Sequence, residues 1–320
     1  MVTVPHQGRV GGFGCWAIGG PFGSGGKAIG WGVVNDDESV AAIRRAIELG
    51  ITFFDTSDVY GVGHSERVLG RAITGCRDDV VVSTKFGYTF DESTRQLTGA
   101  NVSDDYIRAA CDASLHRLGT DRIDLYLLHD DGMAFDRVDG VIAVLESLVA
   151  AGKIRSYGWS TDDPAGAATF AVGPHCAATQ YELNLLDDQP EMLAVCAEHG
   201  MAGINRGPLA MGLLSGKYTA DSRLGEDDVR GNSPSWMRYF RDSRPAPEWL
   251  DRMAAVREVL TSGGRTLAQG ALGWLLARAD TTIPIPGIRT VAQATENAGA
   301  LVHGPLDESA MADIERLLRR

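Results

Sequence analysis

The sequence lacks several features that define common functional classes. No apolar run approaches the roughly 20 residues that a membrane-spanning helix needs, and the first ten residues contain no apolar export signal. No basic stripe is present, and a formal net charge of −12 argues against a nucleic-acid partner. The few cysteines are widely spaced and form no Cys-x-x-Cys pair, so we expect reduced thiols in a cytoplasmic protein. They are Cys15, Cys76, Cys111, Cys176 and Cys196.

Glycine-rich motifs that bind nucleotides are also missing from the turns between a strand and a helix, where such motifs act. Gly12-x-Gly14-x-x-Ala17 has the letters of a dinucleotide-binding turn, but it falls within an expected strand and opens no helix. The stretch 23–27 resembles a phosphate-binding loop but has Pro21 in place of the first glycine and Ala28 in place of Ser or Thr. A doubly wound sheet is therefore the second choice of fold.

What is present is an alternation of strands and helices, repeated eight times. The strands are apolar throughout, as in a parallel sheet covered on both faces, and alternation over this length favours a closed (β/α)8 TIM barrel. We expect one domain over residues 1–320, with a long loop insertion (219–247) after strand 7 and extra C-terminal helices. The expected strands are 13–18, 51–54, 80–85, 123–128, 154–159, 178–181, 202–205 and 282–285. The expected helices are 36–49, 66–73, 103–118, 140–151, 164–170, 190–199, 248–262, 266–279, 291–302 and 307–318.

Reactive side chains stand at the carboxyl ends of these strands, which meet around one pocket in such a barrel. Asp55 ends the second strand and Tyr60 follows on its loop, while Lys85 and His129 end the next two strands. Taken singly, each is more often a structural residue, for example a surface lysine or a rim histidine. Together they favour a site that protonates an oxygen gaining negative charge, because a lysine ammonium lowers the pKa of a nearby phenol and a carboxylate keeps the lysine charged.

Motifs along nearly the whole chain, from about residue 12 to 306, resemble the aldo-keto reductase superfamily. The stretch 54–61, Phe-Asp-Thr-Ser-Asp-Val-Tyr-Gly, is similar to its "FDTA..YG" signature. Further similar motifs follow in family order, at 83–85, 127–129, 158–160, 180–184, 208–217 and 285–297. The Pro-Leu-x-x-Gly-Leu-Leu-x-Gly-Lys-Tyr stretch that begins at Pro208 is closer to the bacterial oxidoreductase and potassium-channel β-subunit branches.

The resemblance implies an NADPH-dependent reductase of aldehydes or ketones. Tyr60 would be the general acid, Lys85 and Asp55 its tuning pair, and His129 the residue that orients the carbonyl. Ser160 and Gln180 would hold the carboxamide, with Asn184 near enough to assist, and Arg289 would hold the 2′-phosphate. The full set of residues that the resemblance assigns to the cofactor is Trp16, Ser160, Gln180, Arg206, Pro208, Leu209, Gly212, Lys217, Gly287, Arg289, Gln293 and Asn297.

Two positions depart from the family pattern. Thr161 replaces the usual asparagine after the serine, which puts one carboxamide contact in doubt. Arg206 replaces the aromatic residue that usually stacks on the nicotinamide. Two alternatives remain for Arg206: it lies against the nicotinamide and disfavours the cationic oxidised ring, or it turns away and pairs with a carboxylate.

The substrate wall is expected in the loops 20–34 and 219–247, which carry a large share of the few aromatic residues. The candidates are Trp31, Trp236, Tyr239 and Phe240. The alternative is that these rings pin a long insertion to the barrel rim. Arg230, Arg238 and Arg241 in the same insertion leave a carboxylated aldehyde open as substrate.

Other functions are kept as alternatives. The first is a regulatory subunit that binds NADPH and turns over slowly, and the second is a barrel isomerase or lyase that binds no nicotinamide. A metal site is not expected, because the Asp-Asp pairs at 130–131, 162–163 and 187–188 lie where loops enter helices, and no second histidine has ligand spacing. The expected partner is a small carbonyl compound, without nucleic acid or membrane, and the oligomeric state is open.

Overall fold

The computed structural model describes residues 11–320 and contains one eight-stranded parallel sheet. Its strands lie in the order β1, β4, β5, β8, β9, β10, β11, β14, which is the order of the chain. A bridge between Gly14 and Gly287 joins the two edge strands, and the Gly14 amide donates to the Pro286 carbonyl at 2.9 Å. The expected (β/α)8 barrel is therefore confirmed. The barrel strands are β1 (Gly12–Gly14), β4 (Phe53–Asp55), β5 (Val81–Phe86), β8 (Ile123–Leu128), β9 (Ile154–Ser160), β10 (Cys176–Glu182), β11 (Ala202–Arg206) and β14 (Thr282–Pro284).

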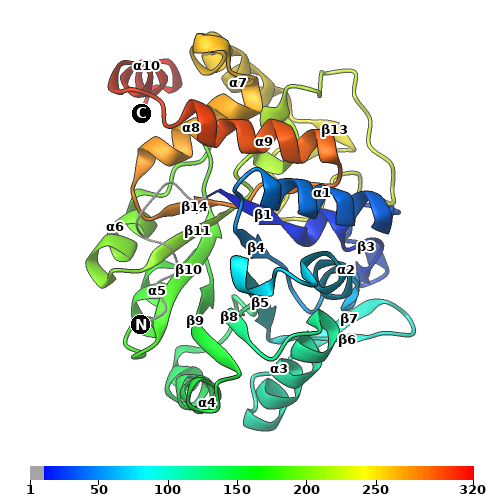
Figure 1. Cartoon of the computed structure of the whole chain (residues 1–320). Coiled ribbons are helices and arrows are strands. Elements are labelled where there is room, and N and C mark those ends of the chain that lie inside the picture. Colours follow the sequence, from blue (N-terminus) through cyan, green and yellow to red (C-terminus); the bar gives the residue numbers. More distant parts are fainter. Residues whose placement is uncertain (1–10) are drawn as a thin grey trace.

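Helices cover the outside of this sheet, and consecutive helices pack side by side around it (Figure 1). The insertion after β11 precedes α7 and α8, and α9 and α10 follow β14, as expected. Within residues 11–320 no helix is both long and apolar enough to cross a membrane. The helices are α1 (Asp36–Glu48), α2 (His64–Ile73), α3 (Asp104–Leu118), α4 (Val138–Ala150), α5 (Pro164–Phe170), α6 (Pro190–His199), α7 (Pro247–Leu260), α8 (Leu267–Arg278), α9 (Val291–His303) and α10 (Glu308–Leu318).

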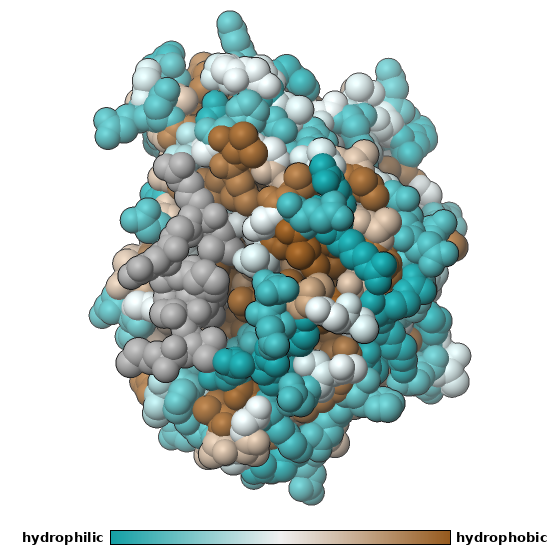
Figure 2. All heavy atoms as spheres, viewed as in Figure 1, coloured by the Kyte–Doolittle hydropathy of each residue, from teal (hydrophilic) through white to brown (hydrophobic). Residues whose placement is uncertain are grey.

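The strands are apolar throughout because each has two buried faces. In β8, Leu125 and Leu127 point into the barrel, where they pack with Phe53 and Ile204. Tyr126 and Leu128 point outward into the layer under the helices. Because successive side chains of a strand alternate between faces, residues 125–128 of this one strand contribute to both layers. Figure 2 shows that hydrophilic residues cover most of the visible surface, with a hydrophobic group near its middle.

Two parts of the fold differ from the sequence prediction. The first strand ends at Gly14, and Cys15–Ile18 form a 3-10 turn rather than more strand, because the chain leaves the sheet where it closes the barrel. The chain after β5 forms a hairpin of β6 (Tyr88–Asp91) and β7 (Gln96–Ala100), which was not expected. This hairpin joins β2 (Gly23–Ser24) and β3 (Lys27–Ala28) in a four-stranded sheet.

The insertion is attached to the loop that precedes α1. The Val229 amide donates to the Gly30 carbonyl at 2.8 Å, and Trp31 pairs with Asp228 in an isolated bridge. The Asn232 side chain donates to the Ala28 carbonyl at 3.1 Å. A short hairpin of β12 (Phe240–Arg241) and β13 (Arg244–Pro245) ends the insertion before α7. These bonds place two loops, far apart in the sequence, over the carboxyl end of the barrel.

Candidate active site

Asp55, Tyr60 and Lys85 come together because β4 and β5 are neighbours in the sheet. Asp55 is paired with Ser83 in the strand register, so the side chain of Lys85 is within reach of Asp55. Tyr60 is brought back over the strand ends by a tight turn at Gly61, which has φ +62°. A Cβ there would lie 1.7 Å from the Gly19 carbonyl oxygen, so the turn requires glycine.

The ammonium group of Lys85 uses all three of its hydrogens inside this cluster. It donates to Asp55 Oδ2 at 2.7 Å, to the Thr56 carbonyl at 2.8 Å and to the Tyr60 hydroxyl oxygen at 3.3 Å. Lys85 is 0% exposed. Because Lys85 donates to the Tyr60 oxygen, the hydroxyl proton of Tyr60 is left to point elsewhere.

Asp55 is held by two further donors. The Gln180 side chain donates to Asp55 Oδ1 at 2.8 Å, and the Ser83 hydroxyl donates to the same oxygen at 3.2 Å. Ser160 lies next in line and donates to Gln180 Oε1 at 3.4 Å. One Gln180 N–H is thus already used within the protein, and Gln180 offers a ligand a single remaining N–H.

The pKa of Tyr60 is raised, whereas the sequence predicts that the lysine lowers it. Burial raises the pKa of Tyr60 above its ordinary value of 10, and the opposing charge of Lys85 does not cancel the effect of burial. Burial alone would lower the pKa of Lys85, but Asp55 and Tyr60 raise it, so Lys85 stays charged. The phenol is therefore protonated in the resting site, beside a cation that stabilises the phenolate when the proton leaves.

His129 follows β8 and faces the Tyr60 ring edge to face, with centroids 5.9 Å apart. Burial and the charges of Lys85 and Arg206 hold the pKa of His129 well below its ordinary value, so the imidazole is neutral. Its Nδ1 lies 3.1 Å from the Ser57 hydroxyl. Among residues 11–320, Nε2 has no hydrogen-bond partner. A neutral ring with one free nitrogen can orient a carbonyl oxygen.

A cavity of about 1180 Å³ extends from these residues along the barrel mouth. Ligand pockets are usually about 300–1,000 Å³, so the cavity has room for more than one small molecule. Asp55, Tyr60 and His129 line it, and Lys85 lies behind Tyr60. All twelve residues that the resemblance assigns to the cofactor line it as well: Trp16, Ser160, Gln180, Arg206, Pro208, Leu209, Gly212, Lys217, Gly287, Arg289, Gln293 and Asn297.

The turn after β11 has an unusual backbone where it borders this cavity. Ala210 and Met211 have φ of +48° and +54°, and Gly212 follows at +90°. Non-glycine residues seldom adopt positive φ, and such strain is concentrated at functional sites. This turn carries the stretch that the sequence assigns to a pyrophosphate, between Leu209 and Lys217.

Arg289 and Arg206 each have partners within the protein. The two terminal nitrogens of Arg289 donate to the carbonyls of Trp31 and Val33, at 3.0 and 2.6 Å. Arg206 forms an ion pair with Asp162 and lies 3.5 Å from a Glu182 oxygen. Pairing with a carboxylate is one of the two alternatives that the sequence left for Arg206, although Arg206 still borders the cavity.

The aromatic residues of the two loops divide into two groups. Trp31, Trp236 and Tyr239 line the cavity, and Trp236 packs 6.3 Å from Trp16, whose ring stacks on Tyr60 at 6.0 Å. Phe240 does not line the cavity: it is buried against Tyr218, so its expected place in the substrate wall is corrected. A large apolar side chain in a long insertion has turned inward, as the pinning alternative predicts.

Asn184 is also corrected. It is buried, and its side-chain amide donates to the Gly207 carbonyl at 3.1 Å and to the Tyr239 hydroxyl at 2.8 Å. It therefore supports the loop after β11 and does not border the cavity. Three of the insertion's arginines are likewise paired: Arg230 with Asp228, Arg238 with Asp187, and Arg241 with Glu248.

Sequence reasoning missed three residues around His129. Tyr88, on β6, lines the cavity and packs 5.3 Å from the His129 ring. Ser57 and Asp58 lie behind His129, where the serine hydroxyl is shared between Asp58 and the ring. The position of Ser57 and Asp58 between Asp55 and Tyr60 was the available signal, but the contact of Ser57 with His129 joins residues 72 apart in sequence.

Comparison with known proteins agrees with this geometry. The model of the Aldo/keto reductase family matches residues 21–319. The chain belongs to the aldo/keto reductase family. It is 32% identical over 280 residues to a Schizosaccharomyces pombe aldo-keto reductase, yakc, whose name includes NADP(+), and the match covers 85% of this chain and 80% of that relative.

Solved structures of this aldo/keto reductase family share the fold. The glycerol dehydrogenase AKR11B4 from Gluconobacter oxydans is 29% identical with a TM-score of 0.80, covering 97% of this chain and 91% of its own. An aldo-keto reductase from Klebsiella pneumoniae, solved in complex with NADPH, is 27% identical with a TM-score of 0.68, covering 88% of this chain and 85% of its own.

Proposed function

We propose that this chain reduces aldehydes or ketones to alcohols with NADPH, and that Tyr60 is the general acid. The observation that carries the proposal is the Lys85 ammonium, which donates to the Tyr60 oxygen and leaves the phenolic proton for a ligand in the cavity. The Klebsiella relative solved with NADPH and the NADP(+) in the name of yakc support the choice of cofactor.

The residues of the groove fit an extended dinucleotide. Ser160 and the remaining N–H of Gln180 lie near the catalytic cluster and suit a carboxamide, while Lys217 suits a pyrophosphate. Arg289 lies just before the amino end of α9, where helix dipoles favour anions, and its unused N–H groups suit a 2′-phosphate. These residues would hold the cofactor along the groove, with Ser160 and Gln180 at the end that also contains Tyr60 and His129.

In the reaction, bound NADPH supplies the hydride to the carbonyl carbon. His129 holds the carbonyl oxygen, and Tyr60 transfers its proton to that oxygen as negative charge develops there. Lys85 stabilises the phenolate that remains, and Asp55 keeps Lys85 charged and in place. Solvent then returns a proton to Tyr60, which completes the cycle.

Replacement of Tyr60 by phenylalanine tests the proposal. General acids supply roughly 10²–10⁴-fold in rate, so Tyr60→Phe should lose that much turnover, measured as NADPH absorbance with a reactive aldehyde. NADPH affinity, from a fluorescence titration, should stay near that of the unmodified protein. Tyr88→Phe is the matched control, because Tyr88 lines the same cavity but its hydroxyl donates to Asp131. A Tyr60→Phe variant with more than half the rate would overturn the assignment of Tyr60.

The same assay distinguishes the proposed enzyme from the alternative function, a regulatory subunit with slow turnover. That function predicts tight NADPH binding and oxidation of about one equivalent per protein, followed by near-standstill. Sustained turnover over many equivalents, with a simple aldehyde, would favour the enzyme. Absence of nicotinamide binding would contradict both and favour an isomerase or lyase.

A further inference from the structure

Ser57 and Asp58 form a buried chain that ends at His129. Both lie on the turn between β4 and Tyr60 and are 0% and 2% exposed. Asp58 Oδ1 lies 3.1 Å from the Ser57 hydroxyl oxygen, which in turn lies 3.1 Å from His129 Nδ1. Because a serine hydroxyl has one proton, Ser57 can donate to Asp58 or to His129 but not to both.

The single proton of Ser57 allows two arrangements of the chain. If Asp58 is protonated, it donates to Ser57, Ser57 donates to Nδ1, and the neutral ring carries its hydrogen on Nε2. If Asp58 is ionised, Ser57 donates to Asp58 and accepts from Nδ1–H, and Nε2 keeps only a lone pair. The hydrogen bond at one ring nitrogen therefore fixes the state of the other.

The surroundings of Asp58 favour its protonated form. Glu66 of α2 and Arg117 of α3 face it, and Arg117 donates its Nε to Glu66 at 2.5 Å. Two buried carboxyl groups thus share one guanidinium, which is already bonded to Glu66. Burial and the charge of Glu66 raise the pKa of Asp58 to about 8. The Arg117 charge and hydrogen bonds from the Ser57 hydroxyl and the Val59 amide oppose this rise. Tyr106 of α3 and Tyr126 of β8 also face Asp58 and remain neutral, since burial raises the pKa of each.

The groups that face His129 keep its ring neutral over the same range of pH. These are Lys85 from β5 and Arg206 from β11, whose charges lower its pKa, together with the rings of Tyr60 and Tyr88. Asp131 faces the same region through its bond with the Tyr88 hydroxyl at 3.0 Å. His129 lines the cavity, and Nε2 is the ring nitrogen that is not bonded to Ser57, so the choice of tautomer decides whether this nitrogen offers a ligand a donor or an acceptor.

We infer that Asp58, acting through Ser57, sets which ring nitrogen of His129 carries the proton. Both are positioning residues, and the catalytic consequence rests on the proposed reductase function. With Asp58 protonated, Nε2–H donates to a carbonyl oxygen and supports reduction. With Asp58 ionised, bare Nε2 accepts from an alcohol hydroxyl and supports the reverse reaction.

The change from one arrangement to the other releases one proton. The Nε2 proton leaves to the cavity, the Ser57 proton moves to Nδ1, and the Asp58 proton moves to Ser57. Each atom of the chain then has the hydrogen that the second arrangement requires, and Asp58 holds the negative charge. No redox partner is needed.

The family signature that the sequence resembles has alanine at the position of Ser57. Ser57→Ala therefore installs a residue that the fold accommodates and removes the link between Asp58 and His129. Asp58→Asn keeps the shape of the side chain but cannot ionise, so it removes the change of charge that would switch the arrangement; its amide can present either N–H or C=O to Ser57.

Nuclear magnetic resonance of the histidine side chains reads the tautomer without any activity. In protein labelled with ¹⁵N-histidine, at pH 6 and pH 10, the His129 signal is assigned by its loss in His129→Asn. We expect Nε2–H at pH 6 and Nδ1–H at pH 10 in the unmodified protein. Asp58→Asn and Ser57→Ala should each show the same tautomer at both pH values. The same tautomer at both pH values in the unmodified protein, or a transition that survives in Asp58→Asn, would overturn the inference.

The pH profile of kcat/KM for aldehyde reduction is the kinetic counterpart. Loss of one neutral hydrogen bond to the substrate predicts a fall of about tenfold as the pH passes through about 8. The fall should disappear in Asp58→Asn and in Ser57→Ala; a profile unchanged in both would contradict the inference. If no carbonyl compound is reduced at any pH, the proposed function fails, but the resonance experiment still decides the tautomer.

Discussion

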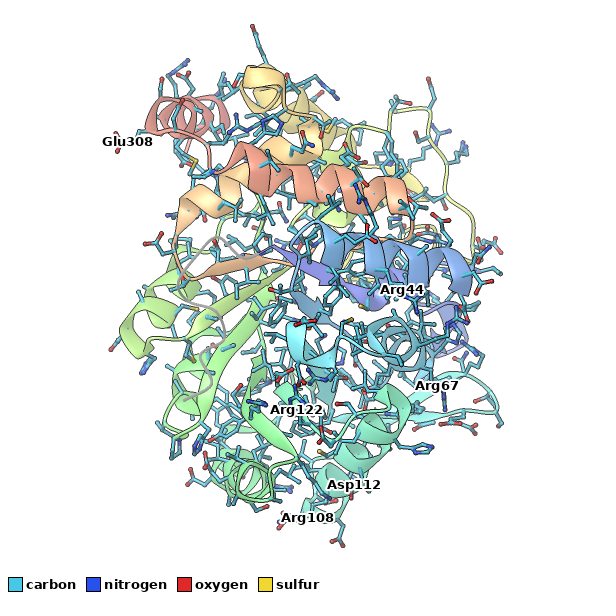
Figure 3. All side chains as sticks on the ribbon, viewed as in Figure 1. Arg44, Arg67, Arg108, Asp112, Arg122 and Glu308 are labelled. Carbon is cyan, nitrogen blue, oxygen red and sulfur yellow. The ribbon has the colours of Figure 1, made fainter. Side chains whose placement is uncertain are left out.

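Buried ion pairs stand at both ends of the barrel strands, and the two ends differ in what these groups face. At the amino end of β8, Asp124 accepts from Arg77 at 2.7 Å and lies 3.3 Å from Arg155. Arg122, labelled in Figure 3, joins the same cluster at 3.9 Å. These groups are paired with one another, and none borders the large cavity.

At the carboxyl end, the pair of Lys85 and Asp55 is more deeply buried and is connected to the cavity. Lys85 donates to the oxygen of Tyr60, and Tyr60 lines the cavity. The comparison shows that a buried ion pair does not by itself mark a reactive site. In the proposed function, the reactive end is the one where a polar group supported by the pair is left for a ligand. This matches the general division of such barrels into a stabilising end and a functional end.

Replacement of Lys85 by methionine should have the largest effect, because it removes both the buried ion pair of the carboxyl end and the hydrogen bond to Tyr60. Asp55 would be left buried without its cation, and removal of one partner of a buried pair costs about 3–5 kcal/mol of unfolding free energy. Turnover should fall by roughly 10²-fold or more, because the Tyr60 phenolate loses its support. Urea unfolding and NADPH absorbance measure the two effects.

Lys153→Met is the matched control, since Lys153 pairs with Asp112 at the surface. Exposed pairs contribute about 0–1 kcal/mol, so this variant should keep its stability and its rate. Equal stability losses in the two variants would mean that burial does not distinguish them.

Arg289→Ala should affect binding without affecting the chemistry. Loss of a charged hydrogen bond to a 2′-phosphate weakens NADPH by about 2–3 kcal/mol, while NADH should lose far less. Arg265→Ala is the control, because Arg265 also donates to backbone carbonyls, at His303 and Gly304, but does not border the cavity. Fluorescence titration with both cofactors measures the difference. Equal losses for NADPH and NADH would assign Arg289 to holding the 31–33 loop instead.

Asp124→Asn tests the opposite end of the barrel. Its carboxylate accepts from Arg77 at 2.7 Å and from the Val82 amide at 2.9 Å, and the loss of charge should reduce the unfolding free energy by about 2 kcal/mol. The kcat at a temperature where the protein is folded should not change. Asp112→Asn, at an exposed position, should change neither quantity. A lowered kcat in Asp124→Asn would show that the two ends are coupled.

The polar residues at the carboxyl end of the barrel could be located from the sequence, because each one is recognised from the strand beside it in the chain. Asp55 ends β4, Lys85 lies one residue before the end of β5 and His129 follows β8, and the order of strands along the chain is the order in the sheet. The hairpin of β6 and β7 was missed because it is short, half exposed and interrupted by polar turn residues, so it has no clear two-residue period.

Contacts between distant loops were the least predictable part of the site. The pairing of Arg289 with carbonyls of the 31–33 loop joins residues more than 250 positions apart. Phe240 was placed on the wrong side of its loop because hydrophobicity alone does not tell whether a ring faces a ligand or the protein interior. Ser57 and Asp58 acquire their chemistry from a histidine on another strand.

Trp236 should have the smallest effect, on the choice among substrates. It is 51% exposed, and its ring extends the stack of Tyr60 and Trp16 toward the mouth of the cavity. Aromatic pairs add about 0.5–1.5 kcal/mol beyond the area they bury, so Trp236→Ala should lower the ratio of kcat/KM for a nitrobenzaldehyde to that for propanal by about 2- to 10-fold.

Phe135→Ala is the control for this change, because Phe135 is similarly exposed, at 46%, but packs on Trp159 away from the cavity. Its ratio should equal that of the unmodified protein. If the Trp236 ring only covers the insertion, both variants will leave the ratio unmoved. If propanal is the better substrate in the unmodified protein, the aromatic wall does not select the substrate. The part of the cavity that matters for function then does not extend beyond Trp16.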